Sequence, residues 1–165
     1  MKAGLLLITG LFISTFCMAQ QVIEMNEEDV DLKVQTWHYT RYEKSKEVKW
    51  ILKVKDGEGV YEADFLFEGD RVVAAYTTDG FILWEQVYFA EKNIPQSVIQ
   101  LLDYRIVKYR VGSFVKYTEF DEVRKPINEE YKVTAFTKTG GEVVYWFDKD
   151  LNLIPEKKIN EVAKR

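Results

Sequence analysis

Three oxygen-bearing side chains stand two residues apart near the end of the chain, in the stretch FDKDLN at residues 147–152. Asp148, Asp150 and Asn152 would occupy the first, third and fifth positions of a calcium-binding loop, where oxygen ligands are required. Such a loop also needs glycine at its sixth position and glutamate at its twelfth, and these positions hold Leu153 and Ile159. The stretch therefore predicts a turn between two strands, and we expect neither a metal site nor a cofactor.

Few other residues could support catalysis. His38 is the only histidine of the chain, and no serine stands in the turn that presents the nucleophile of a hydrolase. A zinc site needs three or four ligands of the His and Cys type, and the sequence has one His and one Cys. We therefore interpret His38 as a surface or boundary histidine. The sequence predicts a protein that is not an enzyme and has no catalytic residues.

The first 19 residues predict a secretory signal peptide. An apolar run from Leu5 to about Phe16 is followed by small residues at the positions that signal peptidase reads, with cleavage expected after Ala19. The run is shorter than the roughly 20 apolar residues of a membrane-spanning helix. Acylation of Cys17 is disfavoured because Phe16 precedes it. We expect a periplasmic or secreted protein without disulfides and without membrane insertion after cleavage.

Composition indicates a globular protein and argues against a nucleic-acid partner. The 165 residues are 47% hydrophobic and 30% charged, with a formal net charge of −4. Contacts to phosphate need clustered Lys and Arg, and such residues gather only at the end of the chain. The expected partner is an envelope or extracellular protein.

The sequence repeats itself with a spacing near 70 residues. Residues 31–50 align with residues 98–117 at several apolar or aromatic positions, for example Trp37 with Tyr104. A period of this length indicates a duplicated small module rather than a solenoid. The predicted organisation is a signal peptide over residues 1–19, a first module over 20–92 and a second over 93–165.

Each copy is expected to begin with a helix and to continue as strands. Pro95 favours a helix start, and an apolar stripe begins at Val98, while Asn26 precedes a group of acids that favours a helix N-terminus in the first copy. Alternating runs separated by turns, such as the Asp-Gly pair at residues 79–80, predict hairpins in series. The expected fold is α+β, with two tandem modules, each one helix packed on a four-stranded antiparallel meander sheet. The last strand of the second module is expected in LNLIPE, at residues 151–156.

One helix can cover only one face of such a sheet. The face left open would present Trp84 and Tyr88 in the first module, with Phe120, Phe136 and Trp146 at matching positions in the second. Large apolar side chains on an open face indicate a covering partner, and Trp and Tyr dominate the energetics of protein interfaces. We predict a partner-binding site formed by Trp84, Tyr88, Phe136 and Trp146. The alternative, that the two modules or two chains cover these faces themselves, stays open.

The tandem pattern, with NIPQSVIQLL opening a helix, Tyr131 within EYKVTAF and VVYWFDKDLNLI closing the module, resembles the PepSY-like family of secreted Bacteroidetes proteins. This family shares the architecture of the beta-lactamase inhibitory protein, two tandem helix-plus-sheet modules. The resemblance implies an exported binding or inhibitor-like protein without established catalytic residues, and it implies no particular ligand. Inhibition of a beta-lactamase is not expected, because the chain lacks disulfide-forming cysteines.

Two functions are compatible with these features. The first is an exported, non-enzymatic binding module, inhibitor-like in its steric mode of action, that recognises a protein partner through an aromatic sheet face. The alternative is a small-ligand carrier or sensor of the periplasm, with its site between the two modules. A concave pocket between the modules would favour the second function.

Overall fold

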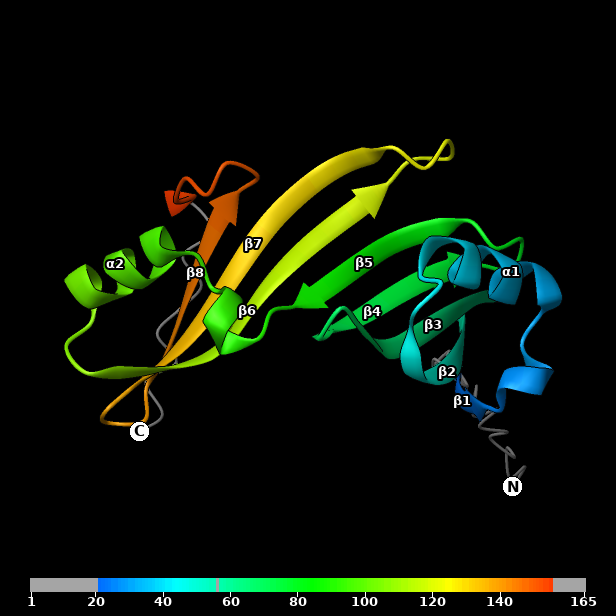
Figure 1. Cartoon of the computed structure of the whole chain (residues 1–165), viewed down its shortest axis with the longest axis horizontal. Helices are drawn as coiled ribbons and strands as arrows, with labels where there is room; N and C mark the ends of the chain where they lie inside the picture. The colour runs from blue at the N-terminus through cyan, green and yellow to red at the C-terminus, as the bar shows by residue number, and fades with distance from the viewer. Residues whose placement is uncertain (1–20, 56, 156–165) are drawn as a thin grey trace, which may run out of the picture.

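A computed structural model describes residues 21–55 and 57–155, and the predicted signal peptide with its cleavage site lies outside them. The chain forms an eight-stranded antiparallel sheet whose strands follow one another in sequence order (Figure 1). The strands are β1 Gln21–Met25, β2 Lys46–Lys55, β3 Glu58–Phe67, β4 Asp70–Thr77, β5 Ile82–Tyr88, β6 Tyr109–Phe120, β7 Pro126–Thr137 and β8 Glu142–Asp148. The helices are α1 Leu32–Arg41 and α2 Gln96–Arg105, preceded by the short 3-10 turns η1 Glu27–Asp29 and η2 Glu91–Asn93. Within the described ranges, neither helix has the length and apolar character needed to cross a bilayer.

The prediction of two tandem modules, each one helix on a four-stranded sheet, is wrong, because one continuous sheet runs through the chain, although the protein is α+β. Strand β5 pairs with β6 from Trp84 opposite Glu119 to Tyr88 opposite Val115, which joins the two halves of the chain in one sheet. The first half contributes five strands because β1, which was not predicted, pairs with β2. The expected strand in LNLIPE forms only a single bridge, between Leu153 and Phe147. The boundary between residues 92 and 93 stays a prediction.

Both predicted helices are present, and local signals account for where they begin. The side chain of Asp31 accepts a hydrogen bond from the backbone N–H of Lys33 at 2.8 Å, which caps the first turn of α1. Helix α2 follows Pro95, whose fixed φ and missing N–H suit the entry to a helix. Each helix turns two or more apolar or aromatic residues toward the sheet, so packing rather than propensity holds it in place.

The two helices pack on the same face of the sheet. Ala74, Glu85, Thr118 and Glu129 lie opposite one another across β4 to β7, so their side chains point to one face. Ala74 belongs to the hydrophobic cluster under α1. Val133, an even number of residues after Glu129 on β7, belongs to the cluster under α2. The helices lie at opposite ends of the molecule (Figure 1), and neither α1 nor α2 covers the other face of the sheet.

His38 lies against aromatic rings of the hydrophobic cluster under α1, so its interpretation as a surface or boundary histidine is wrong. The side chain is fully buried. Its Nδ1 lies 2.9 Å from the hydroxyl of Tyr76 and its Nε2 lies 3.2 Å from Oγ of Ser45. Burial lowers the pKa of His38 to about 4, which keeps the ring neutral near pH 7. His38 is thus a hydrogen-bonded core residue.

The long β6–β7 hairpin reaches from the second half of the chain back to α1 (Figure 1). At its turn, the guanidinium carbon of Arg124 lies 3.4 Å from the ring centroid of Trp37. Phe120, expected on the open face, is instead buried in the cluster under α1, with the guanidinium carbon of Arg41 4.9 Å from its ring centroid. The hairpin therefore ties the two halves together beyond their shared sheet.

Candidate functional site

The open face of the sheet carries a row of four side chains across its last four strands. Tyr88 on β5 lies opposite Val115 on β6, Val115 lies opposite Lys132 on β7, and Lys132 lies opposite Trp146 on β8. These residues alternate with the positions that point toward the helices, such as Val133. The row therefore lies on the face that neither helix covers.

Two further rows extend this surface. Gln86, Tyr117 and Glu130 lie opposite one another on β5, β6 and β7, and Trp84 lies opposite Glu119. The rings of Trp84 and Tyr117 have their centroids 6.3 Å apart. The rows enclose a groove with a volume of about 460 Å³ lined by Gln86, Tyr88, Ser113, Val115, Tyr117, Glu119, Asn128, Glu130, Lys132 and Trp146. We call it the sheet-face groove.

Charged groups are set among the aromatic rings of the sheet-face groove. The Nζ of Lys132 lies 5.7 Å from the ring centroid of Trp146, within range of a cation–π interaction. The hydroxyl of Tyr117 donates to Oε1 of Glu119 at 3.1 Å. Burial, together with this bond and the charges of Glu119 and Glu130, raises the pKa of Tyr117 to about 12. Carboxylate charge therefore lies beside Tyr117, in a groove that Lys132 also lines.

The structure brings three of the four predicted site residues together. Trp84, Tyr88 and Trp146 lie on the open face and are half-buried, so their rings are not sealed inside the protein. Phe136 has the same orientation on β7 as Lys132, but it lies further along the strand, opposite Arg110. It lines a separate, shallower depression at the far end of the β6–β7 hairpin.

Phe136 lies close against the backbone of Gly112. A Cβ atom placed on Gly112 would approach Cε2 of Phe136 to 2.4 Å, so glycine provides the space that the ring occupies. The guanidinium carbon of Arg110 lies 5.2 Å from the same ring. Phe136 is therefore packed against its own hairpin and stands apart from the sheet-face groove.

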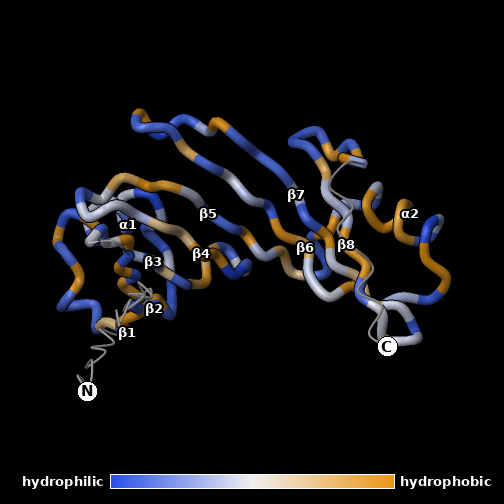
Figure 2. Tube along the Cα trace, turned by 180° about the vertical axis from the view of Figure 1, so that it is seen from behind, coloured by the Kyte–Doolittle hydropathy of each residue, from blue (hydrophilic) through white to orange (hydrophobic). Residues whose placement is uncertain are grey.

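Sequence reasoning missed the residues between the aromatic anchors, chiefly Tyr117, Glu119 and Lys132. Their signal was available in the alternation of β6, where Val115, Tyr117 and Glu119 share one face. This alternation can be recognised only when the strand is taken to extend over residues 109–120. Figure 2, which views the molecule from behind, shows both hydrophobic and hydrophilic residues along β6 and β7, and hydrophilic stretches predominate in β7.

The residues considered for calcium binding form a turn. Oδ1 of Asp148 accepts hydrogen bonds from the backbone N–H groups of Asp150 and Asn152, both at 2.9 Å, and Leu151 has a positive φ of 62°. These bonds close a turn after β8, as predicted. Across residues 21–55 and 57–155, no three His, Cys, Asp or Glu side chains are grouped to hold a metal ion.

A second concave site lies between elements of the two halves. This cavity has a volume of about 230 Å³ and is lined by Trp37, Thr40 and Arg41 of α1, by Tyr76, Gly80 and Ile82 of the β4–β5 hairpin, and by Arg124 of the β6–β7 turn. Ile82 faces it because a β-bulge between Ala75 and Tyr76 places Ile82 and Trp84 on opposite faces. We call it the hairpin cavity.

Comparison with solved structures shows what this fold is similar to. A BLIP-like protein from Bacteroides fragilis matches with a TM-score of 0.57 and 19% identity, over 82% of this chain and 90% of that one. A DUF2874 family protein from Bacteroides uniformis matches with a TM-score of 0.57 and 15% identity, over 75% of this chain and 86% of that one. A protein of Bacteroides eggerthii described as a candidate periplasmic protein matches with the same TM-score and identity, over 76% and 86%.

No protein-family model matches the sequence, and comparison with curated proteins found no match. The structural matches show that this chain has a BLIP-like fold, as the sequence resemblance implied. The two tandem modules expected with that fold are replaced here by one continuous sheet. At these identities the likeness concerns the fold alone.

Proposed function

We propose that this chain, a protein of BLIP-like fold, is an exported, non-enzymatic binding module that recognises a protein partner through the sheet-face groove. Its action would be steric, because the bound face blocks whatever surface of the partner it covers, and in that sense it is inhibitor-like. The observation that carries the proposal is the row of Tyr88, Val115, Lys132 and Trp146 on the face that neither helix covers.

The aromatic residues of the groove have the properties of interface anchors. Trp84, Tyr88 and Trp146 are half-buried, so much of each ring is already held by the sheet and loses little conformational freedom on binding. Such rigid aromatic side chains near the centre of a surface typically dominate binding energy. Phe136, which lies apart from them, contributes to this proposal only if a partner extends along the β6–β7 hairpin.

The charges of the groove indicate the chemistry of the partner. Glu119 and Glu130 flank Tyr117, and the pKa of this tyrosine is raised partly by their negative charge. A Lys or Arg side chain of the partner would meet both carboxylate charge and aromatic faces in this place. We therefore infer that the partner inserts a basic side chain beside Tyr117 and Glu119, which lie one and two rows of the groove away from Lys132.

The proposal is tested by recovering a partner from a bacterial envelope extract and measuring its binding to purified protein. The double variant Trp84→Ala, Trp146→Ala is compared with wild type, and Tyr104→Ala serves as the matched control, because Tyr104 is an aromatic residue of α2 with 86% exposure. Loss of binding in the double variant alone supports the site. Equal binding by all three proteins contradicts it.

Self-association is the competing explanation for an open aromatic face, and sedimentation separates the two. If wild type sediments as a dimer and the Trp84→Ala, Trp146→Ala variant sediments as a monomer, the face joins two copies of this chain, and the proposal of a separate partner is overturned. A wild-type monomer at micromolar concentration leaves the face available to another protein.

Membership of the PepSY-like family and export to the periplasm or beyond belong to the same proposal. The BLIP-like fold supports the first, because the family is expected to share it, and a structural neighbour described as a candidate periplasmic protein supports the second. Cleavage after Ala19 is tested by sequencing the N-terminus of the protein recovered from the culture or the envelope.

A second candidate function is the binding of a small ligand between the two halves. One observation favours it, the hairpin cavity, which is lined by α1 and the β4–β5 hairpin on one side and by Arg124 of the second half on the other. Its volume of about 230 Å³ is below the usual size of a site for drug-like molecules. The ligand would have to be correspondingly small.

A further inference from the structure

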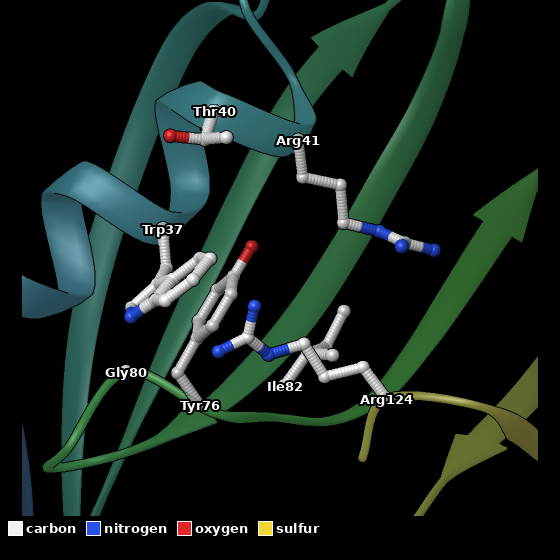
Figure 3. Close-up of a pocket in the computed structure, with 7 residues that line it drawn as sticks. All are labelled: Trp37, Thr40, Arg41, Tyr76, Gly80, Ile82 and Arg124. Carbon is white, nitrogen blue, oxygen red and sulfur yellow. The ribbon is translucent and has the colours of Figure 1, made fainter.

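The hairpin cavity places a positive charge against apolar walls (Figure 3). Arg124 reaches from the β6–β7 turn to Trp37, and its guanidinium carbon lies 3.4 Å from the indole centroid and 5.4 Å from the ring centroid of Phe81. Tyr76 and Ile82 form the adjoining surface of the cavity. A planar cation is thus stacked on aromatic rings at the opening of a small, largely apolar space.

Arg124 has no carboxylate partner among the residues that the structure describes. Two acidic residues of adjoining segments are engaged elsewhere. Glu85 accepts hydrogen bonds from Arg41 and Tyr42, and Asp121 accepts from the backbone N–H groups of Val123 and Lys125. The half-buried guanidinium of Arg124 is therefore held by ring stacking and not by an ion pair with a described carboxylate.

The stacking of Arg124 determines which of its N–H groups remain available for hydrogen bonds. A guanidinium that rests its flat face on an indole keeps the N–H groups on its edge free to donate. Those N–H groups match the two oxygens of a carboxylate in a bidentate arrangement. Arg41, on the opposite rim of the cavity, is already engaged with Tyr42 and Glu85, so it contributes surface rather than an available charge.

We propose that the hairpin cavity binds a small aromatic or branched carboxylate, with the carboxylate paired to Arg124 and the apolar body against Trp37, Tyr76 and Ile82. This inference rests on the second candidate function and is independent of the sheet-face groove. A ligand bound in this way bridges α1 and the β6–β7 turn. Its binding would therefore also strengthen the contact between the two halves of the chain.

The test uses benzoate as the probe and benzamide as its uncharged counterpart, each titrated to about 10 mM and followed by NMR. Gly80 and Trp37 line the cavity. The NMR signals of the Gly80 backbone amide and the Trp37 indole N–H should therefore shift when a ligand binds there. We expect saturable shifts of both signals with benzoate. The affinity for benzamide should be lower than that for benzoate by a factor of about ten or more, because benzamide lacks the charge that a guanidinium stabilises.

Variants identify the residue responsible. Arg124→Gln should weaken benzoate binding about tenfold or more, and Arg124→Lys should give an intermediate loss, because an ammonium keeps the charge without the bidentate geometry. Arg110→Gln is the matched control, since Arg110 also lies over an aromatic ring, that of Phe136, at the far end of the same hairpin. It should bind benzoate as wild type does.

The outcomes that overturn the proposal are distinct. Equal binding of benzoate and benzamide, or equal binding of benzoate by wild type and Arg124→Gln, would leave a small-ligand cavity but contradict the anion site. The absence of saturable shifts with either probe would contradict the second candidate function as well, and Arg124 would then serve only to hold the hairpin on α1.

Discussion

Trp37 and Arg124 join the two halves of the molecule outside the sheet, with the guanidinium carbon of Arg124 3.4 Å from the indole centroid. The first residue belongs to α1 and the second to the β6–β7 turn. Between them they cover the hairpin cavity. The position of the indole in turn depends on the backbone beneath it.

The first prediction concerns Gly80, which lies under Trp37. Gly80 has a φ of +84°, and an added Cβ would stand 2.4 Å from Cδ1 of Trp37 and 2.9 Å from the carbonyl oxygen of Lys33. Gly80→Ala should therefore lower the free energy of unfolding by more than the roughly 1–2 kcal/mol that left-handed backbone costs a residue with a side chain. Urea denaturation measures the change.

Gly69→Ala is the matched control for this effect. Gly69 also has a positive φ, +92°, but an added Cβ meets nothing within 4 Å. The free energy of unfolding of Gly69→Ala should therefore fall only by the cost of placing a residue with a side chain in left-handed backbone. If the two variants lose the same stability, the close contact of Gly80 with Trp37 carries no energetic weight.

The second prediction concerns the pH dependence set by His38. Burial lowers its pKa in the folded protein to about 4, from 6.5 in the unfolded chain. The unfolded chain therefore binds a proton more readily, so stability is fully present above pH 6.5 and is lost as the pH falls toward 4. The loss attributable to His38 should reach up to about 3 kcal/mol.

The His38→Gln variant isolates this contribution, because glutamine keeps hydrogen-bonding groups but does not titrate. Urea denaturation of both proteins at pH 7.5 and pH 4.5 gives four free energies of unfolding. Wild type should lose more stability than the variant over this interval. Parallel losses would show that His38 is not the titrating group.

The third prediction tests the negative character of the sheet-face groove. The pKa of Tyr117 is raised to about 12 by burial, by its hydrogen bond to Glu119 and by the nearby carboxylate charges. Glu119→Gln should lower this pKa toward the ordinary value of 10, without reaching it, because the burial remains. NMR of ring-labelled tyrosine across the alkaline range follows the titration, and an unchanged pKa would contradict the assigned hydrogen bond.

Local features of the fold could be predicted from the sequence because their causes are local. The helix after Pro95 and the turn at Gly80 follow from the conformational limits of these residues. Pairing between distant strands has no such local signal. Nothing in the sequence of β5 states that its free edge pairs with β6 after an intervening helix, so the continuous sheet could not be predicted.

The candidate site was predictable to a similar extent. Alternation along β5 gave the orientation of Trp84 and Tyr88. It cannot reveal the bulge in the β4–β5 pairing that places Ile82 on the opposite face from Trp84. Phe120 was misplaced because the alternation of its strand was assigned in the wrong phase. Tyr117 and Glu119 point to the open face, so Phe120, which follows Glu119, points toward α1.

The central claim is that the sheet-face groove binds a protein, and the dissociation constant of a recovered partner tests it most directly. Calorimetry would compare wild type with the Trp84→Ala, Trp146→Ala variant and with Tyr104→Ala. If two interface anchors are lost, affinity should fall about a hundredfold or more in the double variant, and Tyr104→Ala should match wild type. A double variant that binds the partner as tightly as wild type would contradict the account.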